Sequence, residues 1–397
     1  MTIQVLTAPS EFVLSTSQYA RTYRLIRELG SKNINISVYA NKVSDDLSDL
    51  PGNITLHEFN RDNRLTYSIS MYRDVYRYIR SGEIDLYQHA NIGFRGSNPA
   101  IILPPDPDTP FLVGPAEGGH AVPQAEFKRT LNRQVGVDLP SPIDEAIARG
   151  VEPIFRRVIN PIREKGFSVT LERADKIIAV HSDAKETLGE YTDSEKIEVI
   201  PYGVDMTKFP FNDRVGSELF LTIGNLIRRK GHRYLLDAMK YVTEEFPKAK
   251  LHIVGSGPLR DELESRATDN GIEESVTFHG FVDDDKLVEL LHQARAFVHP
   301  SLSEGFSHVR LEAMSSGCPV IGTNVSGAHD LTRDGTDGRI VPTGDSQALA
   351  AAMLELLEND DLVEEMGRNA REKVERDHDY ADIAQQYLEI YREMAKS

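Results

Sequence analysis

Two glutamates, Glu304 and Glu312, stand eight residues apart in a run that joins a short loop to a helix-forming stretch. Eight residues are a little over two helical turns, so the two carboxylates could share one side of the element. The intervening loop, Gly305, Phe306 and Ser307, would open the helix and offer backbone N–H groups at its positive end, which suits a phosphate. Carboxylates nearby can accept hydrogen bonds from sugar hydroxyls. Together, these features predict a site for a sugar joined to a diphosphate.

Glutamates at this spacing also occur by chance on surface helices, so the flanking residues carry the argument. Pro300 precedes the run, and residues 317–322 follow it as a turn and a buried strand. The passage resembles the glutamate-x7-glutamate signature of the retaining, nucleotide-sugar-dependent glycosyltransferases of family GT4. That resemblance implies the GT-B fold, an α/β architecture of two doubly wound Rossmann-like domains facing across a cleft. It also implies that Glu304 binds hydroxyls of the donor sugar and Glu312 the ribose hydroxyls.

A second motif, residues 222–231, follows a predicted strand and precedes a predicted helix. The turn at Gly224 lets the backbone approach a phosphate and Lys230 adds positive charge, although a basic surface loop would have the same spacing. The segment resembles the family's Gly-Arg-Leu-x-x-x-Lys-Gly element, whose arginine and lysine hold the diphosphate. Asn225 stands at the position of that arginine, which puts bidentate phosphate contact there in doubt. Lys230 would then carry more of the charge, with Arg229 beside it.

A third glycine turn lies in residues 252–259, between a predicted strand and a predicted helix. It begins like the dinucleotide-binding Gly-x-Gly-x-x-Gly motif, but the sixth position is Arg260. An incomplete match is a weak dinucleotide signal, and the spacing alone favours a purely structural turn. The family has a similar turn near the nucleotide base, so the resemblance implies that Gly255 and Gly257 border that pocket.

In the first half of the chain, residues 113–120 place glycines, Glu117 and His120 after a short predicted strand. A lone histidine after a strand is more often structural than catalytic. The segment resembles the Gly-Pro-x-Gly-Gly-Gly loop of some family members, where a histidine of this region contacts the donor sugar and faces the reacting centre. The resemblance therefore implies a catalytic role for His120. Glu117 could be an additional carboxylate of this site, or it could simply be exposed to solvent.

The segment from Arg61 to Arg80 interleaves arginines with tyrosines. A basic, aromatic helix can rest on an anionic membrane surface. The alternative, which the pattern favours, is a solvated helix whose tyrosines pack against the sheet. In the membrane interpretation, the protein would bind peripherally to the inner face of a membrane through residues 61–80. It would also favour a lipid-linked or envelope-glycan acceptor.

The composition is that of a folded, acidic protein. Its 397 residues are 40% hydrophobic and 27% charged, which allows two domains of ordinary size. A net charge of −17 argues against a nucleic-acid partner. The single cysteine, Cys318, excludes an internal disulfide and a multi-cysteine metal site. No apolar stretch approaches the roughly 18 residues that span a bilayer, and the N-terminus resembles a strand instead of a leader, so we expect a cytoplasmic protein.

Short apolar strands alternate with amphipathic helices along the chain, which predicts parallel sheets wrapped by helices. A hinge rich in Pro and Gly, residues 201–218, separates two such sets. We expect an acceptor-binding domain over residues 1–205 with a crossover helix at about 380–397, and a nucleotide-sugar-binding domain over residues 206–379. The expected strands are residues 4–7, 36–39, 54–58, 86–89, 111–113, 176–179, 197–200, 219–223, 250–254, 275–279, 296–299, 320–323 and 338–341.

The resemblance implies transfer of a sugar from a nucleotide diphosphate to a hydroxyl acceptor with retention of anomeric configuration. Lys230 and the loop N–H groups would hold the charge of the leaving group as the glycosidic bond breaks. No cluster has metal-ligand spacing, consistent with the metal-independent chemistry of the family, so no cofactor is expected beyond the donor substrate. Three alternatives remain open: a sugar-nucleotide epimerase, a glycosyl phosphorylase, and a non-catalytic sugar-nucleotide-binding subunit. The sequence does not identify base, sugar or acceptor.

Overall fold

The computed structural model describes eight stretches of the chain, which fall into two compact units. The stretches are residues 2–7, 17–32, 34–40, 49–59, 73–89, 108–117, 160–212 and 216–396. We call Met1–Tyr202 together with Tyr380–Ser397 the N-terminal unit, and Gly203–Asp379 the C-terminal unit. The boundary expected from the sequence was at residues 205 and 206. Each unit is described by itself.

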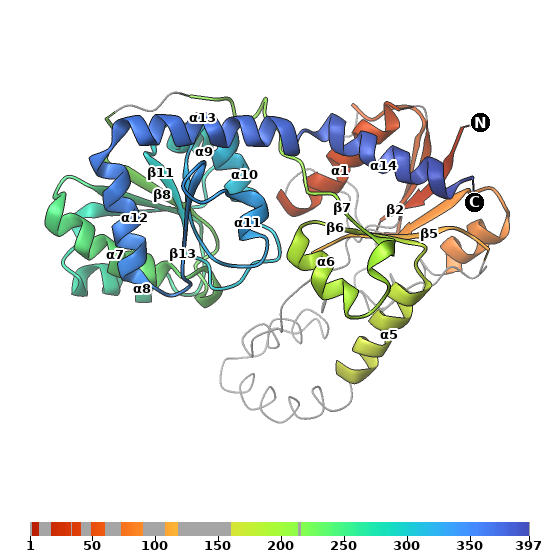
Figure 1. The fold of residues 1–397 in the computed structure, drawn as a ribbon, viewed down its shortest axis with the longest axis horizontal. Coiled ribbons are helices and arrows are strands. Elements are labelled where there is room, and N and C mark those ends of the chain that lie inside the picture. The colour runs from red at the N-terminus through yellow and green to blue at the C-terminus, as the bar shows by residue number, and fades with distance from the viewer. Residues whose placement is uncertain are drawn as a thin grey trace. The chain divides into compact units, whose positions relative to one another are not determined.

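The N-terminal unit is built on a parallel sheet of seven strands in the order β3-β2-β1-β4-β5-β6-β7 (Figure 1). All four residues of β4 and all six of β5 are buried, as expected for central strands of a parallel sheet covered on both faces. The seven strands predicted from the sequence are confirmed. They are β1 (Gln4–Thr7), β2 (Asn35–Ala40), β3 (Ile54–Glu58), β4 (Leu86–His89), β5 (Phe111–Ala116), β6 (Lys176–Ala179) and β7 (Ile197–Val199).

Helices α1 (Ser17–Gly30), α5 (Asn160–Arg173), α6 (Ser182–Gly189) and α14 (Tyr380–Met394) belong to the same unit. The last of these, α14, comes from the far end of the chain and lies beside α1 (Figure 1). Its buried face joins a hydrophobic core with α1 and with strands of the sheet. The Tyr391 hydroxyl donates a hydrogen bond of 2.6 Å to Gln88 on β4, which ties α14 to the centre of the sheet.

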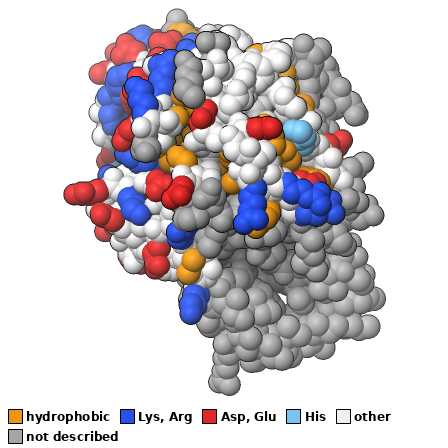
Figure 2. Space-filling view, turned by 90° about the vertical axis from the view of Figure 1, so that its right-hand side faces the viewer, with side chains coloured by type: hydrophobic (Ala, Val, Ile, Leu, Met, Phe, Trp, Pro, Cys, Tyr) orange, Lys and Arg blue, Asp and Glu red, His pale blue; other side chains and the backbone are white. Residues whose placement is uncertain are grey.

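Residues 73–80 form the described part of the basic, aromatic segment, and residues 61–72 lie outside the described stretches. Val75 and Ile79 are buried on this helix, and Tyr78 packs against the same core. The arginines of the helix are exposed. Figure 2, which faces this side of the molecule, shows acidic and basic side chains mixed over the described surface. The packing of Tyr78 agrees with the sheet-packed alternative for that tyrosine.

The C-terminal unit contains a six-stranded parallel sheet in the order β10-β9-β8-β11-β12-β13. Its strands also confirm the expected set. They are β8 (Leu219–Ile223), β9 (Lys250–Val254), β10 (Val276–Gly280), β11 (Ala296–His299), β12 (Val320–Thr323) and β13 (Gly338–Val341). Strand order reverses between β8 and β11. In open α/β sheets such a switch point, at the carboxyl ends of the strands, is where ligands bind.

Helices connect and cover the strands of this second sheet (Figure 1). They are α7 (His232–Glu245), α8 (Arg260–Asp269), α9 (Asp284–Gln293), α10 (His308–Ser315), α11 (Ala328–Leu331), α12 (Ser346–Glu358) and α13 (Asp360–Asp377). Helix α7 shows why the local sequence folds this way. Its apolar residues Leu235, Leu236, Met239 and Val242 recur at helical spacing and are fully buried in one core with the strands.

Candidate active site

The loops that follow β8, β9 and β11 meet at the carboxyl edge of the second sheet. The Leu226 N–H donates to the Ser256 carbonyl at 2.9 Å, joining the first two loops. The Leu302 N–H donates to the Arg229 carbonyl at 2.8 Å, joining the first and the third. The segments that carry Lys230 and Glu304 therefore flank the switch point between β8 and β11.

Glycines allow these loops to touch. Gly231 has φ +67°, and a Cβ there would lie 1.9 Å from the Pro300 carbonyl oxygen. Gly255 has φ +133°, and a Cβ there would lie 2.0 Å from the Gly224 carbonyl oxygen. At Gly257, a Cβ would lie 2.5 Å from the carbonyl oxygen of the loop after β8, at Leu226. Loop-to-loop packing is thus a sufficient reason for these glycines, and the expected place of Gly255 and Gly257 beside a nucleotide base stays a prediction.

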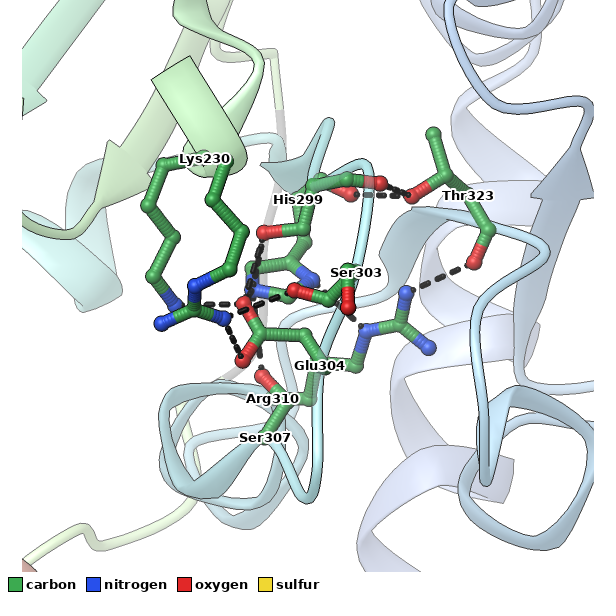
Figure 3. A network of polar contacts seen from close by, with 9 residues as sticks. Lys230, His299, Ser303, Glu304, Ser307, Arg310 and Thr323 are labelled. Atoms are coloured by element: carbon green, nitrogen blue, oxygen red, sulfur yellow. Dashed lines mark hydrogen bonds and ion pairs between the residues drawn. The ribbon is translucent and has the colours of Figure 1, made fainter. Parts of the chain in front are cut away.

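Glu304 lies at the centre of the site, with only 6% of its surface exposed. Its two carboxylate oxygens accept hydrogen bonds from different cations: Lys230 Nζ at 2.5 Å and Arg229 Nη1 at 2.9 Å (Figure 3). The Ser301 hydroxyl donates to the same carboxylate at 2.7 Å. Arg229 also donates to the Ser303 carbonyl at 2.7 Å, which ties it to the loop that carries Glu304. Glu304 belongs to one sequence motif and Lys230 and Arg229 to another, and the fold brings the three into one cluster.

The electrostatics of this cluster keep Glu304 ionised. Burial alone would raise the pKa of Glu304, but the hydrogen bond with His299 and the charges of Lys230 and Arg229 outweigh it and hold that pKa well below its usual value. Burial lowers the pKa of His299 to about 3, so the imidazole is neutral near pH 7. Glu304 is therefore a weak base, and its chemistry is that of a fixed hydrogen-bond acceptor.

A second tier of buried polar residues lies behind Glu304, and its members His299 and Arg310 were not predicted from the sequence. His299 Nε2 is 3.4 Å from Glu304 Oε1, and 3.2 Å from the Ser307 hydroxyl. Arg310, which has no exposed surface, donates from Nε to His299 Nδ1 at 3.1 Å and from Nη2 to the Thr323 carbonyl at 3.0 Å (Figure 3). The sequence signal that could have found Arg310 is a charged residue next to Leu311 on a helix side that is otherwise apolar.

Glu312 lies on α10, while Glu304 lies in the loop before that helix. The expected helical relation between the two carboxylates is therefore wrong, because helix geometry begins only at His308. Glu312 is half-buried, and its role at a ribose stays a prediction.

The expected phosphate loop precedes α10. Ser307 occupies the N-cap position with extended backbone, yet its side chain makes no cap hydrogen bond and contacts His299 instead. Phe306 is 8% exposed, and its ring centroid lies 4.9 Å from that of His308. Gly305 links Phe306 to Glu304 and is half-buried. The start of α10 thus presents a helix end without a serine cap directly beside the Glu304 cluster.

The remaining predicted residues are less informative. Asn225 is exposed at the start of the loop after β8, and a Cβ at Gly224 would lie 3.5 Å from the aliphatic part of Lys230. His120 lies outside the described residues. Glu117 belongs to the N-terminal unit, where the Tyr202 hydroxyl donates to it at 3.3 Å. It is therefore hydrogen-bonded and not simply exposed.

Two features are absent from the described stretches. No three side chains of His, Cys, Asp or Glu are grouped there in a way that could hold a metal ion. No helix in those stretches has the length and apolarity needed to cross a membrane.

The sequence matches two protein families, one in each half. Residues 205–373 match the family described as "Glycosyl transferases group 1", and residues 20–208 match "Glycosyltransferase Family 4". The chain belongs to the family 4 glycosyltransferases. This confirms the resemblance drawn from the glutamate signature and from the loop around Lys230.

Curated relatives of this chain match over part of their length. A phosphatidyl-myo-inositol mannosyltransferase of Mycobacterium leprae is 33% identical over 251 residues, which covers 62% of this chain and 64% of the relative. A D-rhamnosyltransferase of Pseudomonas aeruginosa is 33% identical over 232 residues, covering 55% and 59%. The chain thus spans less than two thirds of the length of these relatives.

Several solved structures match this chain over its full length. A glycosyltransferase from Rickettsia africae has a TM-score of 0.71 and 16% identity, and the match covers 100% of this chain and 99% of that one. At this identity the likeness concerns the fold alone. It confirms the predicted GT-B class, with two parallel-sheet α/β domains.

Proposed function

We propose that this chain is a retaining glycosyltransferase that moves a sugar from a nucleotide diphosphate to a hydroxyl acceptor. The observation that carries the proposal is the Glu304 carboxylate, buried at the switch point and bound by Lys230 and Arg229. One acidic acceptor and two cations in a single cluster match the two parts of an activated sugar. The hydroxyls of the sugar need acceptors, and its diphosphate needs positive charge.

Hydrogen-bond capacity supports this assignment. Lys230 has three N–H groups and donates one of them to Glu304. Within the described stretches its side chain makes no other hydrogen bond. The remaining groups can turn to a phosphate without breaking the contact with Glu304. The start of α10, where the Ser307 side chain makes no cap hydrogen bond, adds a positive dipole end nearby. These donors would stabilise the charge that develops on the leaving group, and the proposal requires no resident metal ion.

Glu304 fits the role of a sugar-hydroxyl acceptor better than that of a nucleophile or base. Its low pKa and its two cationic partners reduce its basicity and nucleophilicity. The proposal therefore needs no enzyme nucleophile: the departing phosphate helps to take the acceptor proton, and the acceptor enters on the same face of the sugar. His120 is proposed to contact the donor sugar, and Glu312 the ribose.

Arg229 is proposed to supply the second cation that the family pattern places at position 225. Asn225 is uncharged and exposed, whereas Arg229 is anchored beside Lys230 by Glu304 and the Ser303 carbonyl. A guanidinium held in this way keeps a fork of donors in a fixed orientation. This arrangement compensates for Asn225 without a new residue elsewhere.

The acceptor is proposed to be lipid-linked or part of an envelope glycan, presented at the inner face of a membrane. The mycobacterial relative is named for a lipid acceptor, phosphatidyl-myo-inositol. In this chain, Arg73, Arg77 and Arg80 are exposed on one short helix. Flotation with vesicles tests the membrane contact. Binding to phosphatidylserine vesicles that weakens in high salt and in a triple arginine-to-glutamine variant supports it, and equal binding to phosphatidylcholine vesicles contradicts it.

A thermal-shift panel tests the donor site. The protein is melted with UDP-, GDP- and ADP-sugars, since a ligand at about 100 times its Kd stabilises the folded state by about 2.7 kcal/mol. We expect one donor class to raise the melting temperature, the increase to vanish in Glu312→Ala, and the matched variant Glu262→Ala, changed at an exposed site on α8, to retain it. No increase with any donor class would contradict the proposal.

Product analysis with the stabilising donor separates transfer from its alternatives. A glycosylated acceptor with the donor's anomeric configuration supports a retaining transferase. Release of nucleotide diphosphate without any glycosylated acceptor indicates the epimerase. Stabilisation without turnover indicates the non-catalytic subunit. Cleavage of a glycoside by inorganic phosphate to give a sugar phosphate, with no nucleotide required, indicates the phosphorylase.

A further inference from the structure

Arg310 is a charged side chain enclosed in the C-terminal unit, directly behind the Glu304 cluster. It has no exposed surface, and its Nη1 has no hydrogen-bond partner in the described stretches. Gly322 makes room for it, because a Cβ at that position would lie 2.4 Å from Nη2. Burial lowers the pKa of Arg310 to about 10, which leaves the guanidinium protonated near pH 7. A buried, incompletely paired cation costs stability, so its presence calls for another explanation.

The contact between Arg310 and His299 dictates where the imidazole carries its proton. A guanidinium N–H can only donate, so His299 Nδ1, at 3.1 Å from Arg310 Nε, must accept. The neutral ring then carries its hydrogen on Nε2. That atom faces Glu304 Oε1 at 3.4 Å and the hydroxyls of Ser301 at 3.3 Å and Ser307 at 3.2 Å.

The opposite tautomer would turn a lone pair toward an ionised carboxylate. Glu304 would lose a donor and face repulsion, although Lys230, Arg229 and Ser301 would still hold it from other sides. The carboxylate could then rotate about its side chain toward those remaining donors. A hydroxyl-binding acceptor that moves by a fraction of an ångström loses much of its catalytic value.

We propose that Arg310 is a positioning residue, which fixes His299 as the Nε2–H tautomer so that His299 holds the Glu304 carboxylate in its sugar-binding orientation. The relay from α10 through β11 to the loop after β11 consists of Arg310, His299 and Glu304. The effect of this relay on sugar transfer rests on the proposed function, whereas the tautomer of His299 does not.

Nitrogen-15 NMR of the histidine-labelled full chain tests the relay directly. The His299 signals are assigned by their absence in His299→Gln. In the wild type we expect an unprotonated Nδ1 and a protonated Nε2. In Arg310→Met, and in Arg310→Lys, which keeps a charge but has no Nε, we expect protonation of Nδ1 to appear. With an active donor and acceptor pair, kcat should fall about 10- to 100-fold, with little change in donor KM.

Arg295→Met is the matched control. Arg295 is also buried, at 3% exposure, but it bonds backbone carbonyls of Leu356 and Ser217, in a part of the unit where it does not contact His299 or Glu304. We expect this variant to lower the melting temperature while leaving the His299 signals and the kcat of the folded enzyme as in the wild type.

Two outcomes separate the relay from the proposed function. Arg310→Lys or Arg310→Met that folds, keeps a protonated Nε2 alone and retains kcat within twofold would overturn the relay. A changed tautomer in the variants, together with a wild type that transfers no sugar, would support the relay and count against the proposed function.

Discussion

His89, His232 and His299 are buried side chains, and burial lowers their pKa values to about 4, about 4 and about 3. An imidazole in the unfolded chain titrates near 6.5. At pH values between the folded pKa and the unfolded pKa, each of these histidines is protonated in the unfolded state and neutral in the folded state. The stability contributed by each group is therefore fully present above pH 6.5 and is lost as the pH falls through the folded pKa.

His232 gives the clearest test of this pH dependence. Its Nδ1 has no hydrogen-bond partner within the described stretches, so an apolar replacement breaks little. From pKa values of 6.5 and about 4, we expect His232→Leu to remove about 3 kcal/mol of the loss in unfolding free energy between pH 7 and pH 4. Urea unfolding at several pH values measures it. His329→Gln, changed at an exposed site on α11, serves as control, and equal slopes in all three proteins would refute the prediction.

At the scale of elements, the site depends on loops that pack against each other at one edge of a sheet. The loop after β8 carries the cations and the loop after β11 carries Glu304. Gly231 lies at their contact, with a positive φ and no room for a Cβ beside the Pro300 carbonyl. An element boundary therefore positions the charges: the left-handed turn that ends the basic loop also starts α7.

Comparing Gly231→Ala with Gly271→Ala separates the effect of the contact with Pro300 from the effect of backbone strain. Both glycines have similar positive φ values, of +67° and +70°, but a Cβ at Gly271 would meet nothing within 4 Å. We expect Gly271→Ala to cost about 1–2 kcal/mol, the price of a left-handed alanine. Gly231→Ala must also push the Pro300 backbone away, so we expect a loss of about 3 kcal/mol or more and a large fall in sugar transfer. Denaturant unfolding and a transfer assay measure both, and equal losses in the two variants would argue against the loop contact.

At the scale of the whole molecule, the chain ends in the unit in which it began. After the C-terminal unit, α14 returns to the N-terminal unit and buries Ile383, Tyr387, Leu388, Tyr391 and Met394, among others, in its core. Each fully buried large apolar side chain contributes about 1.5–3 kcal/mol. Their sum is comparable to the 5–15 kcal/mol that stabilises a typical domain.

A chain that stops at Asp379 tests that dependence. We expect the N-terminal unit to unfold and the C-terminal unit, whose core does not include α14, to retain its own transition and the donor-induced stabilisation. Calorimetry and limited proteolysis measure the two units separately. A truncated chain that keeps both transitions of the full-length protein would show that α14 is dispensable.

Local sequence was sufficient for much of this protein. Apolar runs bounded by turn residues predicted the strands, because a parallel sheet buried on both faces demands such runs. Glu304 and Lys230 could be identified as candidate site residues, because charged side chains beside glycine turns can be recognised in the sequence. The family resemblance added the fold, which the comparisons confirm.

Tertiary structure decided what those residues do to one another. Arg229 and Lys230 stand more than seventy residues from Glu304, so their pairing depends on strand order. The proton on His299 depends on Arg310, and burial, which no local pattern states, keeps that histidine neutral. Helix spacing misled at Glu304 because α10 begins after it. Side-chain types along a chain indicate which chemistry is available, whereas desolvation and through-space partners, set by packing, determine the charge and orientation of each group.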